Sequence, residues 1–259
     1  MNNLLVRAIG WRATVLHGDP CVFDRWRWLR RHLLPGPLRT LEVGCGSGAF
    51  TFYASKIGNW SVGVSYDEEN NLKARARAEL LHLTNIEFIT LDVALLRSLV
   101  TRVGKFDQVI CFETIEHIME DKKLVSDLSF ALKPGGRLLL TTPFKHYRPL
   151  LGDRVSETQD GGHVRWGYTL QEMAGLFEEN GLAVASQEYV SGIVSQQLTN
   201  AMRLLSRANA VAAWAAVFPL RVFQVFDPML TNLISYPYLS IAVVGVKQDT
   251  VPAGVEGSK

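Results

Sequence analysis

The sequence predicts an α/β fold with a seven-stranded, mostly parallel sheet, helices on both faces and a helical cap inserted before the last strand. Two observations support this fold class. From Leu38 to Val190, short apolar runs alternate with segments of helical periodicity, and this alternation favours a parallel, doubly wound sheet. The glycine-rich stretch LEVGCGSGAF, Leu41–Phe50, joins the first strand of that series to a helix, and ligands of such sheets bind at the carboxyl ends of the strands.

The composition is that of an ordinary globular protein. The chain has 259 residues, of which 47% are hydrophobic and 20% are charged, and its formal net charge is +2. This balanced charge argues against a nucleic-acid partner. The three cysteines, Cys21, Cys45 and Cys111, are far apart and form no CxxC, so we expect a reduced, cytoplasmic protein. We expect a single domain, with a helical segment at residues 1–37, a core at 38–190, the cap at 191–237 and the last strand at 238–248.

The elements of the first half follow from local signals. Asp19-Pro20 marks a helix start, because aspartate caps a helix and proline suits its first position, and Pro35 ends this helix. Apolar runs bounded by turn residues predict strands at 38–43, 60–64 and 86–91. Helical spacing of the apolar residues predicts helices at 50–57, 68–83 and 94–101.

The second half continues the alternation and then departs from it. The same signals predict strands at 106–111, 137–142, 182–190 and 238–247, and helices at 122–132 and 170–180. The apolar, helix-patterned stretch 191–236 interrupts this rhythm, and we interpret it as the cap. Its most apolar part, Ala208–Leu220, contains Pro219 and is shorter than the roughly 20 residues that a spanning helix needs. We therefore predict no membrane span.

The glycines of the first loop, Gly44, Gly46 and Gly48, follow a G-x-G-x-G spacing. Taken alone, they are also consistent with a tight strand-to-helix turn. Together with Glu42, they resemble motif I of the class I S-adenosylmethionine (SAM)-dependent methyltransferases. The stretches FDQVICFETIEHI and LKPGGRLLLTTP are similar to that family's fourth strand and to the turn before its fifth. This resemblance covers about Leu38–Val190 and implies a Rossmann-like fold.

The resemblance also implies how SAM is held. Motif I of the family binds the cofactor, which assigns Glu42, Gly44, Cys45, Gly46 and Gly48 to it. An acidic residue at the end of the family's third strand bonds the adenine amino group. Asp92 has that position here, and the Val93 backbone is expected beside the adenine. If Asp92 does not bind the cofactor, we expect it to cap a helix.

The second strand ends differently from that of most members of the family. The usual acidic residue is replaced by Ser65, and Asn70 follows five residues later. This pair is similar to the cyclopropane fatty acid synthase branch, which implies that Ser65 and Asn70 contact the ribose. Asp67 lies between them, either as a further ribose contact or as the cap of the next helix.

The stretch CFETIEHIME, Cys111–Glu120, places Glu113, Glu116 and His117 at i, i+3 and i+4. A helix starting here would bring them onto one face, and acidic groups also favour a helix start without any catalytic role. The small-RNA 2′-O-methyltransferases and ubiquinone-biosynthesis O-methyltransferases carry a similar E-x-x-E-H. By resemblance, Glu113, Glu116, His117 and a later histidine, His163, form a site for Mg²⁺, Mn²⁺ or Zn²⁺. Catalysis by Glu113, Glu116 and His117, with His117 as a proton relay, is the alternative.

The acceptor is predicted only in outline. The long connection Pro143–Thr169 is rich in cationic and aromatic residues and is expected to be functional. The aromatic residues of the cap are interpreted either as internal packing or as the wall of an apolar acceptor site; they are Trp214, Phe218, Phe223 and Phe226. An alternative is peripheral membrane contact through the cap, with three arginines at its rim, Arg203, Arg207 and Arg221.

The predicted function is therefore SAM-dependent O-methylation of a small or lipid-like hydroxylated acceptor that has a hydrophobic part. Carbon methylation or cyclopropanation of a lipid is the alternative chemistry, suggested by Ser65 and Asn70. A non-catalytic SAM-binding scaffold is the alternative from another class of protein. The sequence leaves the identity of the acceptor and the oligomeric state open.

Overall fold

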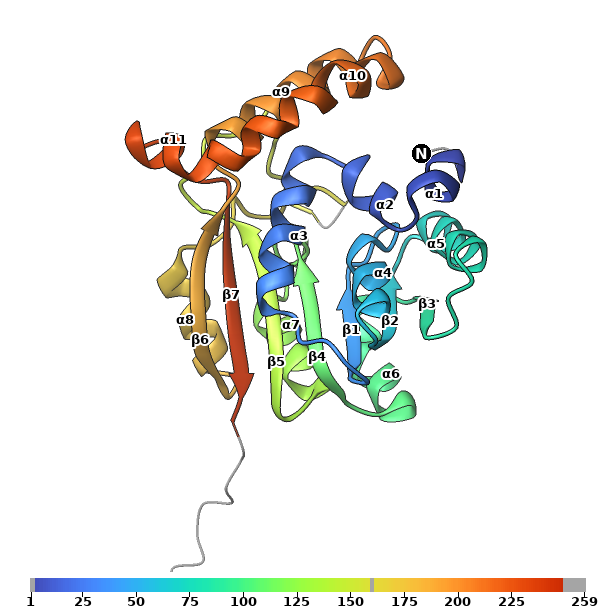
Figure 1. The fold of residues 1–259 in the computed structure, drawn as a ribbon. Coiled ribbons are helices and arrows are strands. Elements are labelled where there is room, and N and C mark those ends of the chain that lie inside the picture. The colour runs from blue at the N-terminus through green and yellow to red at the C-terminus, as the bar shows by residue number, and fades with distance from the viewer. Residues whose placement is uncertain (1–2, 159–160, 249–259) are drawn as a thin grey trace, which may run out of the picture.

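The computed structural model describes residues 3–158 and 161–248 (Figure 1). Its seven-stranded sheet has the order β3-β2-β1-β4-β5-β7-β6, and β7 is antiparallel to both of its neighbours. The predicted fold class is confirmed. The strands are β1 Arg39–Val43, β2 Trp60–Ser65, β3 Ile86–Thr90, β4 Phe106–Phe112, β5 Leu132–Pro143, β6 Leu182–Val190 and β7 Ser240–Lys247.

Helices cover both faces of the sheet. On one face, α3 and α4 pack over β4, β5 and β7, and α5 packs beside α4. On the other face, α6, α7 and α8 pack over the remaining apolar side chains of the same strands. The helices before the cap are α1 Asn3–Ile9, α2 Arg12–Leu16, α3 Pro20–His32, α4 Ala49–Lys56, α5 Glu68–Leu80, α6 Leu96–Val103, α7 Asp121–Ala131 and α8 Leu170–Glu178, with 3₁₀ turns η1 Val93–Leu95 and η2 Ile115–His117.

Most of the predicted element bounds agree with the structure to within a few residues. Asp19 caps α3 by accepting a hydrogen bond from the Cys21 backbone N–H at 2.8 Å, as its sequence position indicates. The helix predicted to reach residue 83 ends at Leu80, and His82 beyond it has a φ of 51°. The strand predicted from residue 137 already begins at Leu132.

The cap consists of α9 Ile193–Ser206, α10 Ala210–Val217, η3 Phe218–Phe226 and α11 Asp227–Leu233. It lies across the carboxyl ends of the parallel strands (Figure 1). The helical run Ala210–Leu233 extends past the apolar stretch Ala208–Leu220, because Pro219 and Pro228 occupy first-turn positions, where proline is tolerated. By length and composition alone, the run Ala210–Leu233 could cross a membrane, and 22% of its most apolar window is buried.

Asp24 of α3 is a buried carboxyl group beneath the cap. Burial raises its pKa from 3.8 to about 6. Its Oδ1 accepts a hydrogen bond from Gln224 Nε2 of η3 at 3.4 Å, and hydroxyl groups of Ser195 and Ser191 offset part of the effect of burial. Because the native pKa is the higher one, folding favours the protonated form, and stability decreases as pH rises from about 4 to about 6.

We expect Asp24→Asn to remove this pH dependence. Relative to the wild type, the variant should gain up to about 3 kcal/mol of unfolding free energy between pH 4 and pH 7, which is the energy of a shift of about two pKa units. Urea denaturation at the two pH values measures the gain. An equal difference between the two proteins at both pH values would contradict the assignment.

Candidate active site

A cavity of about 570 Å³ opens at the carboxyl ends of β1, β2 and β4; we call it the glycine-loop cavity. Gly44 has a φ of 78°, and a Cβ added to it would lie 2.2 Å from Thr114 Oγ1. Only glycine allows the loop this close approach. The cavity is lined by Gly44, Gly46, Ser65, Tyr66, Asp67, Asn70, Asp92, Val93, Glu113, Thr114, His117, Ile118 and Gly161.

Six of the nine predicted SAM contacts line this cavity, and three do not; the three are Glu42, Cys45 and Gly48. Glu42 is buried against α4, where its carboxylate accepts a hydrogen bond from Thr51, and burial raises its pKa to about 8. Cys45 packs in an apolar cluster with Phe52 and Phe88. These two side chains stabilise the glycine loop from the side that faces away from the cavity.

Two acidic residues of the cavity also cap helices. Asp67 accepts a hydrogen bond from the Asn70 backbone N–H at 3.1 Å at the start of α5, and it also accepts one from the Asn70 side chain at 2.6 Å. The capping interpretation of Asp67 is therefore the one that the contacts support. Asp92 accepts a hydrogen bond from the Ala94 backbone N–H at 2.9 Å. Only one oxygen of Asp92 is used, and the carboxylate still faces the cavity.

A second, smaller cavity of about 170 Å³ lies behind the first; we call it the polar cavity. Glu113 and His117 line both cavities and therefore lie between them. The polar cavity is closed by residues from α3, the Pro143–Thr169 connection and α9. Its polar side chains are Asp19, Cys21, Arg25, Glu113, Glu116, His117, Tyr147, Asp153, His163, Thr199 and Arg203.

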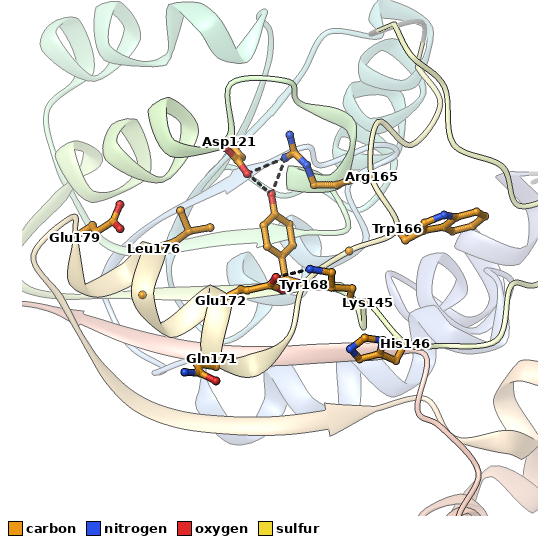
Figure 2. Close-up of a pocket in the computed structure, with 12 residues that line it drawn as sticks. Asp121, Lys145, His146, Arg165, Trp166, Tyr168, Gln171, Glu172, Leu176 and Glu179 are labelled. Carbon is orange, nitrogen blue, oxygen red and sulfur yellow. Dashed lines mark hydrogen bonds and ion pairs between the residues drawn. The ribbon is translucent and has the colours of Figure 1, made fainter.

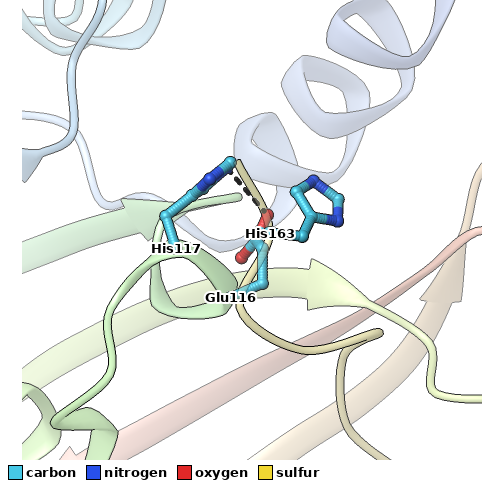
Figure 3. Close-up of side chains that lie close together, drawn as sticks. All are labelled: Glu116, His117 and His163. Atoms are coloured by element: carbon cyan, nitrogen blue, oxygen red, sulfur yellow. Dashed lines mark ion pairs between the residues drawn. The ribbon is translucent and has the colours of Figure 1, made fainter. Parts of the chain in front are cut away.

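Three predicted ligands converge at the polar cavity (Figure 3). One ligand atom from each of Glu116, His117 and His163 lies within 4.8 Å of the other two. The two imidazole rings stand nearly perpendicular, with centroids 4.8 Å apart. Glu116 is fully buried on η2, and its backbone carbonyl accepts a hydrogen bond from the Val164 N–H at 2.8 Å. This bond joins η2 to the loop that carries His163.

The hydrogen bonds leave ligand atoms of this cluster without a partner. His117 Nδ1 donates a hydrogen bond to the Gly162 carbonyl oxygen at 3.0 Å, and its Nε2 lies 3.8 Å from Glu116 Oε1. Among the described residues, neither Glu116 Oε1 nor His163 Nδ1 has a hydrogen-bond partner. Burial raises the pKa of Glu116, with a smaller contribution from Glu113. Burial also lowers the pKa of His163, assisted by His117.

Glu113 does not join the cluster, contrary to the predicted four-residue set. Its φ of 43° is left-handed, so the chain turns sharply after β4 instead of entering a helix. The carboxylate is directed to α3, where Glu113 Oε2 lies 3.1 Å from Arg25 Nη1. Arg25 therefore neutralises Glu113. Sequence reasoning missed this pair, because 88 positions separate the two residues.

A third cavity, of about 850 Å³, lies outside this site, against α8 (Figure 2). Lys145, His146, Arg165 and Trp166 of the Pro143–Thr169 connection line this outer cavity. Arg165 is held in a network with Tyr168 and Asp121 (Figure 2). Among the described cationic and aromatic residues of the connection, Tyr147 and His163 line the polar cavity. Most of the cationic residues in this connection thus face away from the glycine-loop cavity.

The fold and the glycine loop at the carboxyl edge of its sheet define the class I SAM-dependent methyltransferases. Residues 22–187 match the family model described as a methyltransferase domain, and the chain belongs to this family. The chain therefore contains a methyltransferase domain.

Its relatives are distant. A ubiquinone biosynthesis O-methyltransferase of Nitrobacter winogradskyi is 27% identical over 165 residues, which are 61% of this chain and 60% of the relative, so less than two thirds of that protein is matched. Coclaurine N-methyltransferase, solved with SAH, aligns with a TM-score of 0.57 at 16% identity over 85% of this chain and 71% of that one. Phosphoethanolamine N-methyltransferase 2 of Haemonchus contortus, solved with SAM, aligns with a TM-score of 0.59 at 17% identity. The alignment covers 93% of this chain and 57% of that one. At these identities, the structural matches establish the fold.

We expect Asp92→Ala to weaken SAM binding by roughly 1–3 kcal/mol, the range for leaving a polar partner unsatisfied. Calorimetric titration with SAM measures the loss. Because Asp92 also caps η1, Asp67→Ala serves as the control, since it removes a cap in the same cavity. An unchanged SAM affinity in Asp92→Ala would assign Asp92 to capping alone.

Proposed function

We propose that this enzyme transfers the methyl group of SAM to a hydroxyl oxygen of a small or lipid-like acceptor. The observation that carries this proposal is the pair of adjoining cavities. SAM would occupy the glycine-loop cavity, and the acceptor hydroxyl would enter the polar cavity beyond Glu113 and His117. The polar cavity is small and lined by ionisable groups, which suits a hydroxyl better than an alkyl chain.

We further propose that Glu116, His117 and His163 hold a divalent cation. Three observations support this: the three side chains converge, Glu116 Oε1 and His163 Nδ1 are buried without a hydrogen-bond partner among the described residues, and His117 Nε2 faces Glu116 Oε1. A cation at this place would take over the role of the proton that burial favours on the Glu116 carboxyl group. One oxygen and two nitrogen donors suit Zn²⁺ or Mn²⁺, and a small inward shift would bring them to coordination distance.

The chain's own groups would then position the reaction. SAM supplies an already activated methyl group, so the protein mainly aligns the acceptor and excludes water. A bound cation would lower the pKa of the acceptor hydroxyl. Gly162 fixes the His117 ring through Nδ1, and the Arg25 guanidinium offsets the Glu113 charge. The apolar part of the acceptor would extend toward the cap, because α9 forms one wall of the polar cavity.

Labelled SAM with three probes tests the acceptor chemistry. The probes are an alkyl catechol, an alkylamine of equal chain length and vesicles of an unsaturated phospholipid. The proposal expects label on the catechol oxygen. Label on the amine or on the lipid acyl chain would replace it with nitrogen or carbon methylation. SAM binding without transfer to any of the three would favour a different acceptor class or a scaffold.

A further inference from the structure

In the outer half of the cap, the buried side chains are polar and the exposed ones are largely apolar. Along η3 and α11, the buried side chains are polar: Arg221, Gln224, Asp227 and Thr231. The side chains between them are apolar and each is more than half exposed: Val222, Phe223, Val225, Phe226, Met229 and Leu233. A surface helix normally buries its apolar stripe and exposes its polar one. Here the sequence-based interpretation of the cap aromatics as internal packing is wrong for Phe223 and Phe226.

The polar stripe is fixed by bonds to the rest of the protein. Arg221 donates to the backbone carbonyls of Leu16 and Gly18. Gln224 donates to the Pro20 carbonyl at 3.0 Å, and Asp227 accepts from the backbone N–H groups at the start of α9. These bonds determine which side of the run faces outward. They also argue against a membrane-spanning helix. If this helix left the protein to span a membrane, the charged side chains of Arg221 and Asp227 would lie in hydrocarbon without these partners.

The exposed charged residues of the cap are all basic. Between residues 191 and 237, the only acidic residue is Asp227, which is buried. Arg207, at the turn between α9 and α10, is exposed at one end of the cap. At the other end, the exposed Arg148 lies over the Tyr236 ring at 4.7 Å. Arg221, which the sequence placed at the rim, is buried instead.

From these observations we propose that this face, made of η3 and α11, docks on the surface of a lipid bilayer that contains anionic lipids. The apolar side chains enter the boundary between headgroups and acyl chains, and Arg148 and Arg207 contact lipid phosphates. A second copy of the chain fits the face less well. An aligned two-fold pairing would bring a basic end of one copy against a basic end of the other, with no exposed acid of the cap to pair with.

Docking would also place the bilayer beside the active site. α9 packs against η3 and α10 and contributes Thr199 and Arg203 to the polar cavity. The cap lies over the carboxyl ends of the strands (Figure 1). A docked bilayer would therefore have the cap between itself and the cavity where the acceptor is proposed to bind. This relation to a lipid-like acceptor rests on the proposed function, whereas the docking itself does not.

Vesicle flotation of the full chain tests the proposal. We expect the wild type to float with vesicles of phosphatidylcholine and phosphatidylglycerol. We expect Phe223→Glu/Phe226→Glu to lower the partition coefficient at least tenfold. The matched control is Leu34→Glu/Leu72→Glu, which adds the same charge at leucines that are 44% and 55% exposed away from the cap. This control should bind within twofold of the wild type.

Two further measurements make the result decisive. SAM titration should give the same affinity for all three proteins, which shows that they are folded and separates this test from that of methyl transfer. Light scattering without lipid should give a monomer. Failure of the wild type to float on any vesicle, or equal loss in both double variants, would overturn the proposal. So would a dimer that Phe223→Glu/Phe226→Glu dissociates, because the face would then belong to a second copy.

Discussion

His163→Ala is expected to lower kcat/KM for methyl transfer about 100-fold, nearly as far as His117→Ala does. The reason is that both imidazoles would supply ligands to one cation together with Glu116. A factor of 100 corresponds to roughly 2.7 kcal/mol of transition-state stabilisation, within the range for a metal acting on a developing oxyanion. Treatment with a chelator should abolish activity, and Mn²⁺, Zn²⁺ or Mg²⁺ should restore it. Calorimetry with Mn²⁺ should show one site in the wild type and much weaker binding in each variant.

His146→Ala is the matched control for this experiment. It removes a histidine from the same connection, but His146 lines the outer cavity and not the polar one. Its activity and Mn²⁺ affinity should equal those of the wild type. The cation would be excluded by full activity after exhaustive chelation, with no metal found by elemental analysis. His117 would then act alone as the proton acceptor, and His163→Ala would have little effect.

Gly46→Val is expected to raise the Kd for SAM at least about 100-fold while the protein stays folded. Gly46 has a φ of 49° and lines the glycine-loop cavity. Within the described part of the chain, no atom lies within 4 Å of an added Cβ. The valine side chain would therefore meet the cofactor and not the protein. Calorimetric titration with SAM, together with urea denaturation, separates the two effects.

Gly135→Val is the control for backbone strain. Gly135 has a similar positive φ of 71°, also with no described atom within 4 Å of an added Cβ, but it lies in the first part of β5, where the pairing with β4 is interrupted. Each valine should cost roughly 1–3 kcal/mol of stability through the left-handed backbone. Only Gly46→Val should lose SAM affinity. Normal SAM binding by Gly46→Val would show that the cofactor does not lie against this loop.

The sequence by itself determined the order of strands and helices, the glycine loop and the positions of the candidate ligands. These depend on neighbours a few positions apart in the chain. A G-x-G-x-G spacing between a strand and a helix requires a tight turn at a known edge of the sheet. In the same way, the adjacent Glu116 and His117 must lie near each other whatever the rest of the fold does.

The tertiary structure alone decided which of these groups meet. Glu113 shares the E-x-x-E-H motif, yet the left-handed turn after β4 directs it to Arg25 of α3, and His163 completes the cluster from 46 positions away. Periodicity located the cap helices but could not say which stripe faces the protein. That choice is made by hydrogen bonds from Arg221 and Gln224 to α2 and α3, about 200 positions earlier in the chain. Side-chain spacing defines the stripes of a helix, whereas only the partners brought to it by folding determine which stripe is buried.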